Sequence, residues 1–272
     1  MTTIKQFIKE INLTHWKELQ ETLERELKGS RFIYRGQESS DWKLTSKLDR
    51  LLQRLPPDDH ESISVMHLRN FQLSTRGRRG PASLKLENDD EWWSLGQHYG
   101  LATPLLDWTE SPFVALFFGF EKESITKNVN RAVYALDPDV LLMKSGYDKF
   151  LMSFDKYSGA VVGKSNDGQL NGIGEIVGST SDENMRLVNQ RSVFVRLKKG
   201  TSLEDLINSF ASMEIFEKYN SPVLYKFIIP DIDREKCLLF LNKMNINHLT
   251  LYPDLIGSTT YCNNLLELYD IT

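Results

Sequence analysis

The sequence predicts a single compact α+β domain, with a central mixed or antiparallel sheet flanked by helices. Short runs of β-branched and aromatic residues occur between longer segments of helical periodicity. The 272 residues contain no internal repeat, low-complexity run or linker, so nothing in the pattern divides the chain. Residues 1–30 are predicted to form an N-terminal helix packed on the domain, and residues 31–272 the domain itself.

The composition is typical of a globular protein in a reducing compartment. Hydrophobic residues make up 40% and charged residues 26%, and the net charge is −4. This charge argues against a protein that binds nucleic acid over its whole surface, although it leaves local basic patches possible. Cys237 and Cys262 fit no metal spacing and no disulfide framework, so no metal site is predicted. The charged N-terminus and the lack of a bilayer-length apolar run predict a cytoplasmic protein without membrane contact.

The first part of the chain predicts helices around one short strand. Apolar residues of segment 4–27 fall near one helical face, and Gly29 would end that helix. Residues 32–34 then predict a strand. Further helices are expected over the following segments: 45–55, 59–75 and 87–99.

Arg35 is a candidate anion-binding residue at the end of this early strand. It precedes Gly36, which permits the close approach of backbone or ligand. A guanidinium in such a position suits a phosphate or carboxylate. The alternative is a salt bridge to Glu38 or Asp41.

The central stretch, residues 92–120, is the densest in large rings and reactive side chains. Its last part predicts a buried, uncharged helix over residues 113–120, capped by Thr109 or Ser111 and started by Pro112. Trp108 is expected to be buried against this helix. The polar residues before it would lie near the helix N-terminus, where anions are favoured: Gln97, His98, Thr103, Asp107, Thr109 and Glu110. Asp107 equally suits a plain role as a helix-capping acid.

The second half of the chain predicts four strands, three helices and a glycine-rich segment. Strands are expected at 131–136, 193–197 and 222–229, with a further short one at 248–251. Helices are expected at 201–210, 234–244 and 254–268, with Asp231 capping the second. Residues 158–181 contain imperfect P-loop and dinucleotide-fingerprint patterns whose flanks fit neither motif, so a loop over a site is predicted. His15, His60, His67 and His248 are interpreted as surface or packing histidines.

Four segments together resemble the FRG domain family. They are FIYRGQ followed by DWKLTSKLDR (32–50), QHYGLATPLLDWTESPFVALFFGF (97–120), RLVNQRSVF (186–194) and INHLTLYPDL (246–255). The chain departs from the family pattern at Pro104, where Arg is usual, and at Asn189-Gln190-Arg191, where Gln-Gln-Gly is frequent.

The order of elements is also similar to that of ADP-ribosyltransferases, which use NAD to modify a protein or nucleic acid. In such enzymes an early arginine binds the phosphates, aromatic residues stack on nicotinamide, and a late acid stabilises an oxocarbenium-like transition state. By this similarity Arg35 would hold phosphate, and His98 would shape the pocket. Asp107 or Glu110 would supply charge, and Gln190 stands where a late Glu is usual. The remaining residues expected around the dinucleotide are Tyr34, Gly36, Gln37, Tyr99 and Thr103.

Two other functions remain open from the sequence. One is a nucleotide- or nucleic-acid-binding module without turnover, in a bacterial stress or phage-defence system; negative net charge then favours a small nucleotide. The other is a metal-dependent hydrolase that uses His98 with Asp107 and Glu38, although no strong metal-ligand spacing is present. In each case we expect Arg35 and Gln190 to line one pocket with Gln37, His98 and Asp107. The macromolecular acceptor and the oligomeric state are not indicated.

Overall fold

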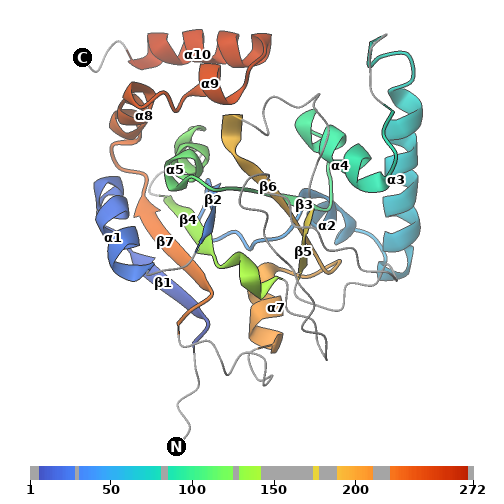
Figure 1. The fold of residues 1–272 in the computed structure, drawn as a ribbon, viewed down its shortest axis with the longest axis horizontal. Coiled ribbons are helices and arrows are strands. Elements are labelled where there is room, and N and C mark those ends of the chain that lie inside the picture. Colours follow the sequence, from blue (N-terminus) through green and yellow to red (C-terminus); the bar gives the residue numbers. More distant parts are fainter. Residues whose placement is uncertain are drawn as a thin grey trace, which may run out of the picture.

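The computed structural model describes residues 6–27, 31–80, 85–124, 129–141, 174–177, 189–210 and 221–268. Within these ranges, seven strands form one sheet in the order β1-β7-β4-β2-β3-β6-β5 (Figure 1). The strands are β1 (Ile8–Asn12), β2 (Ile33–Gln37), β3 (Leu105–Thr109), β4 (Asn130–Leu136), β5 (Gly174–Val177), β6 (Ser192–Leu197) and β7 (Leu224–Pro230). β1 pairs with β7 in parallel, and the other neighbours are antiparallel. This mixed sheet confirms the predicted α+β fold.

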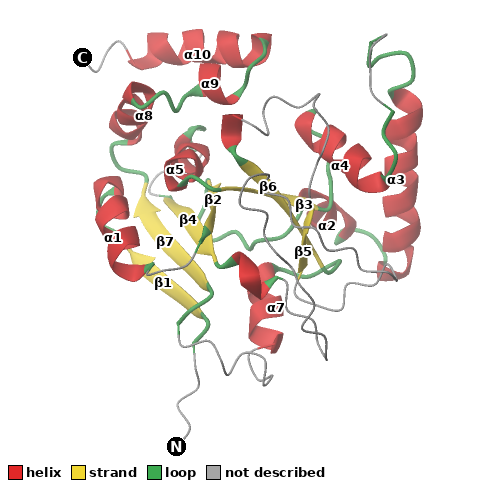
Figure 2. Cartoon of the chain, in the orientation of Figure 1, coloured by secondary structure: helices red, strands yellow, loops and turns green. Residues whose placement is uncertain are grey.

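Helices surround the sheet (Figure 2). They are α1 (Leu19–Glu26), α2 (Lys47–Leu52), α3 (His60–Ser74), α4 (Asp89–His98), α5 (Pro112–Phe120), α7 (Leu203–Phe210), α8 (Arg234–Lys243), α9 (His248–Leu251) and α10 (Leu255–Leu268). Short 3-10 turns lie at Trp16–Glu18, Pro57–Asp59 and Pro138–Val140. Nowhere in the described ranges is a helix both long and apolar enough to cross a membrane.

Alternate residues of β4 are buried in two different cores, one on each face of the sheet. Val133 and Ala135 pack in the core that contains residues of α1, α5 and α8. Tyr134 and Leu136 pack in the core that contains residues of α7. A third cluster joins α2, α3 and α4 to β3 and β6. The period-two alternation of strand side chains therefore places β4 between the first two of these cores.

The sheet opens between β2 and β3. β2 pairs with β4 over five residues, and β3 pairs with β6 over five, but β2 and β3 pair only at Tyr34 and Thr109. The two halves of the sheet therefore diverge beyond this single pair. The carbonyl and amide groups at the opening are free from the regular ladder, and this is where a side chain or ligand can enter.

α5 fills the core beside this opening. Ser111 caps the helix by accepting a hydrogen bond from the Val114 amide at 3.4 Å, and Pro112 occupies the first turn, as the sequence predicted. A side chain on Gly36 would meet the Ala115 carbonyl oxygen at 1.9 Å, so only glycine allows β2 to lie this close to α5. Trp108 is 1% exposed, which agrees with its predicted burial. It is not buried against α5 as expected, because it lies in the core that contains residues of α7, whereas the α5 residues lie in the other core.

Several sequence expectations are wrong for physical reasons. The segment predicted to be an N-terminal helix begins with strand β1, because residues 8–12 pair with β7 near the other end of the chain. Residues 248–251 are helical, since Asn247 and Thr250 form a capping box. Asp107 is a strand residue and caps no helix, because Ser111 takes that position. Asp231 does not cap α8 but pairs with Arg131.

Of the glycine-rich segment, residues 158–181, the structure describes only residues 174–177. Residues 174–177 form β5, an edge strand of the sheet, rather than part of a loop. Residues 158–173 and 178–181, with the imperfect P-loop, lie outside the described residues.

Candidate functional site

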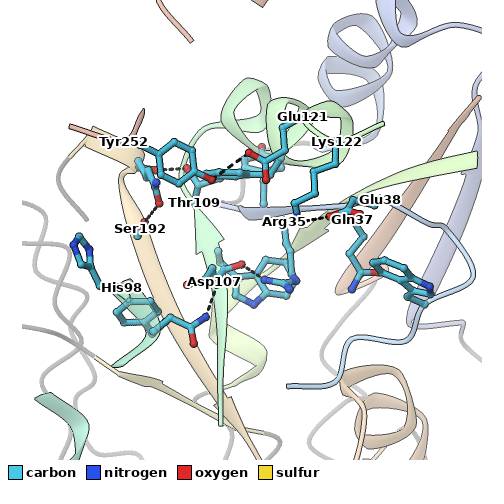
Figure 3. Close-up of a pocket in the computed structure, with 18 of the residues that line it drawn as sticks. Arg35, Gln37, Glu38, His98, Asp107, Thr109, Glu121, Lys122, Ser192 and Tyr252 are labelled. Carbon is cyan, nitrogen blue, oxygen red and sulfur yellow. Dashed lines mark hydrogen bonds and ion pairs between the residues drawn. The ribbon is translucent and has the colours of Figure 1, made fainter. Parts of the chain in front are cut away.

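A cavity of about 360 Å³ lies at the opening between β2 and β3. Figure 3 shows Arg35, Asp107, Glu121 and Tyr252 around it. Its walls come from β2, β3, β6, α2, α4 and the end of α5. Further residues come from the segment after β2, the segment before β6 and the segment after α9. The lining residues are Tyr34, Arg35, Gly36, Gln37, Glu38, Trp42, Arg50, Gln97, His98, Asp107, Trp108, Thr109, Phe118, Glu121, Lys122, Gln190, Ser192, Phe194 and Tyr252.

Arg35 lies across the opening of the sheet. Its Nη1 donates a hydrogen bond to the backbone carbonyl oxygen of Asp107 at 2.6 Å, so it joins β2 to β3 where the ladder stops. Its buried Nε has no partner among the described residues, and none of their carboxylates lies within ion-pair distance. Burial lowers the pKa of Arg35, but a guanidinium remains protonated in proteins. The alternative salt bridge to Glu38 or Asp41 is therefore not formed, and Arg35 lines the cavity.

Asp107 presents its carboxylate to the cavity beside Arg35. Gln97 Nε2 donates to Asp107 Oδ2 at 2.6 Å, and Thr103 donates to Gln97 Oε1. Burial raises the pKa of Asp107, whereas the charge of Arg35 and the hydrogen bond from Gln97 lower it. Thr103 is fully buried outside the cavity, so it orients Gln97 instead of contacting a ligand.

The end of α5 contributes a charged wall that the sequence analysis did not identify. Tyr252 OH donates to Glu121 Oε2 at 3.1 Å, and Lys122 pairs with Glu38 at 2.8 Å. Burial raises the pKa of Glu121 to about 7. The available signal was that Glu121 and Lys122 directly follow a helix without charge. Charges at the end of a buried helix must face solvent, a partner or a cavity.

Gln190 lines the cavity but is held by structural hydrogen bonds. Its Nε2 donates to the Leu251 carbonyl oxygen at 2.9 Å, and its Oε1 accepts from Ser192 at 3.3 Å. Thr109 Oγ1 donates to the Gln190 backbone oxygen at 2.7 Å. Both ends of the amide are thus used to attach α9 and β6 to the site.

Aromatic and cationic residues outside the predicted set complete the walls. Trp42 lines the cavity and is 52% exposed. Arg50 also lines it and donates to the Thr45 carbonyl oxygen at 2.5 Å. The charge of Arg50 adds to the effect of burial in lowering the pKa of Arg35. Two cations near an exposed indole suit an anion that carries an aromatic ring.

The structure brings most of the predicted site residues together. The cavity is lined by Tyr34, Arg35, Gly36, Gln37, His98, Asp107 and Gln190. Glu110 lies elsewhere, paired with Arg31. Tyr99 is 73% exposed and packs edge-on against His98, with ring centroids 4.6 Å apart. Thr103 is buried in the core and donates a hydrogen bond to Gln97. Glu110, Tyr99 and Thr103 are therefore not cavity-lining residues.

Three buried polar atoms of the cavity-lining residues lack partners among the described residues. They are Arg35 Nε, Gln37 Oε1 and Trp108 Nε1. Leaving a buried polar group unpaired costs about 1–3 kcal/mol, so native structures seldom keep such groups without a reason. Their concentration around one cavity indicates a site built for a polar ligand. No group of three or more His, Cys, Asp or Glu within the described ranges is arranged to hold a metal ion.

A comparison with protein families agrees with the motifs in this site. The model of the FRG domain matches residues 30–128. Within these residues the chain is therefore similar to the FRG domain. No curated protein and no solved structure matches the chain. The FRG domain match includes β2, α4, β3 and α5, and so provides Arg35, Asp107 and Glu121. Gln190, Ser192, Phe194 and Tyr252 complete the cavity from later in the chain.

Proposed function

We propose that the FRG-domain cavity binds NAD and transfers ADP-ribose from it to an acceptor. The observation that carries this proposal is the placement of Arg35 beside Asp107 in one cavity, where the guanidinium forms no salt bridge with a carboxylate of the described ranges. A dinucleotide offers phosphate to the cation and, during reaction, a developing positive charge to the carboxylate. The site therefore has a charge of the right sign for each part of the substrate.

The phosphate side of the site is formed by Arg35 and Arg50. Both line the cavity, and charge-assisted hydrogen bonds from arginine to phosphate are among the stronger polar contacts in proteins. The cavity volume of about 360 Å³ lies in the range of small-ligand sites, about 300–1,000 Å³. Trp42 and Phe118 supply ring surfaces against which a base or nicotinamide can stack.

The chemistry requires charge stabilisation more than covalent assistance. The bond between ribose C1′ and the nicotinamide nitrogen breaks, its electron pair leaves with neutral nicotinamide, and the acceptor bonds to C1′. Positive charge develops on the ribose in this step, and a nearby carboxylate held in place before the reaction stabilises it. Asp107 has that position because Gln97 and, behind it, Thr103 fix its carboxylate.

A second candidate is a nucleotide-binding module without turnover. Gln190 favours it, because this neutral amide stands where the resemblance leads us to expect an acid, and both of its ends are engaged by Leu251 and Ser192. The same cations and rings would then hold a nucleotide as a ligand.

Arg35→Ala and Asp107→Asn separate the two functions. Arg35→Ala removes a charge-assisted contact of about 1.5–3 kcal/mol, so NAD affinity should fall roughly 10- to 150-fold. Asp107→Asn should keep binding within a few-fold and abolish nicotinamide release. Calorimetry measures the first quantity and chromatography the second.

Arg31→Ala provides the matched control, because Arg31 pairs with Glu110 outside the cavity and its loss should leave NAD affinity unchanged. Binding by wild type without nicotinamide release, even with protein and nucleic-acid acceptors present, would support the binding module. Failure of wild type to bind NAD at millimolar concentration would refute the transferase.

A further inference from the structure

Glu121 is a second carboxyl group in the cavity, on the wall formed by the end of α5. Its side chain is 13% exposed. Tyr252 OH donates to Oε2 at 3.1 Å, and His248 Nε2 lies 3.6 Å from the same oxygen. Lys122 is turned away from it to pair with Glu38 (Figure 3). Glu121 therefore has one hydrogen-bond donor of its own and no tight ion pair among the described residues.

Two buried arginines fix the backbone that carries Glu121. Arg234 donates from Nε to the Phe120 carbonyl oxygen at 2.8 Å and from Nη2 to that of Glu121 at 2.7 Å. Arg131 donates to the carbonyl oxygens of Gly119 at 3.1 Å and Lys122 at 3.0 Å. Arg131 is itself held by Asp231 at 2.8 Å. Since the last carbonyls of a helix lack intrahelical partners, these cations hold the end of α5 rigidly.

We propose that Glu121 is the general base that takes the proton from the attacking nucleophile. This inference rests on the proposed ADP-ribose transfer. The attacking O–H or N–H group, water in the simplest case, bonds to ribose C1′ as nicotinamide leaves with the bonding electrons. The released proton passes to the Glu121 carboxylate, so atoms and charge balance.

The surroundings of the two carboxyl groups divide these roles between them. Burial raises the pKa of Asp107, but the nearby Arg35 guanidinium opposes the rise and favours the charged form that electrostatic stabilisation needs. Glu121 is shielded from water, and its pKa of about 7 is near the value at which a base is most effective at neutral pH. Two carboxyl groups with different environments in one site are the usual arrangement for such a division.

Glu121→Gln in the full chain tests the assignment. The amide keeps the size of the side chain and an oxygen to accept from Tyr252, so NAD affinity should stay within about two-fold. Nicotinamide release should fall roughly 10²- to 10⁴-fold, the usual contribution of general base catalysis. Release by wild type should rise about ten-fold per pH unit below pH 7 and level off above it, and the variant should lose this dependence.

Glu204→Gln is the matched control. Glu204 is another desolvated carboxyl, accepts from the Leu44 amide at 3.1 Å, and lies outside the cavity. Its change should alter neither release nor the pH profile. A Glu121→Gln variant with the rate and profile of wild type would overturn the inference and leave the transferase standing. Absence of NAD binding or nicotinamide release by wild type would refute the transferase and this inference together.

Discussion

Asp107 and Glu121 face the same cavity in different surroundings. Asp107 lies beside a guanidinium and accepts from an amide, whereas Glu121 accepts from the Tyr252 phenol and lies near the His248 ring at the end of α5. Burial raises the pKa of both, but Arg35 and Gln97 oppose the rise at Asp107. The chemistry of each carboxyl is therefore set by neighbours from other elements of the fold.

Gln97 should control the pKa of Asp107. Its Nε2 donates to the charged carboxylate at 2.6 Å, and a bond to the charged form lowers a pKa. Gln97→Ala removes that donor, so the pKa of Asp107 should rise, as a carbon-13 titration of the side chain by NMR would measure. Thr103→Val removes only the bond that orients Gln97 and should give a smaller rise in the same direction. An unchanged Asp107 titration in Gln97→Ala would show that the contact is not made in solution.

α5 is the element on which the site depends. Its N-terminus is capped by Ser111, its side meets Gly36 of β2, and its end carries Glu121 and Lys122 into the cavity. Because Arg35 and Gln37 flank Gly36 on β2, the distance between β2 and α5 sets how the two walls face each other. The site therefore requires close helix–strand packing as well as the right side chains.

Gly36→Ala should disrupt this packing. The added methyl would lie 1.9 Å from the Ala115 carbonyl oxygen, a backbone atom that cannot rotate away. Overpacking of a core typically costs about 1–3 kcal/mol, and a backbone clash belongs at or above the upper end. Gly119→Ala is the control on α5, since its methyl would meet its nearest neighbour at an ordinary 3.6 Å. Urea unfolding of both variants measures the cost. Equal stability of the two variants would mean that β2 and α5 lie further apart than described.

The whole molecule shows which features a sequence can predict. Ser111-Pro112, Gly36 and the alternation in 193–197 are local signals, and the cap, the tight packing and β6 agree with them. β1 was missed because its partner β7 is far along the chain. The role of Glu121 depends on Arg131, Arg234 and Tyr252, which no local pattern links to it. Long-range strand pairing and desolvation arise only in the assembled fold, so local sequence patterns cannot predict them.

The stability of the whole molecule should report the burial of Glu121. Its pKa is raised from the ordinary 4.5 to about 7, so the folded state holds a proton that the unfolded chain releases. The contribution of the protonated Glu121 to the free energy of unfolding is fully present below pH 4.5. It is lost as the pH rises through 7, where Glu121 ionises in the folded state. The total change is about 3 kcal/mol.

Glu121→Gln stays neutral and should escape this loss. The free energy of unfolding of the variant minus that of wild type should therefore increase by about 3 kcal/mol from pH 4.5 to pH 8. Urea titrations of both proteins at each pH measure the difference, and the contributions of other titrating groups cancel in the comparison. A difference that is the same at both pH values would mean that Glu121 titrates like an exposed carboxyl. The physical reason for choosing it as the base would then be lost, whatever its effect on turnover.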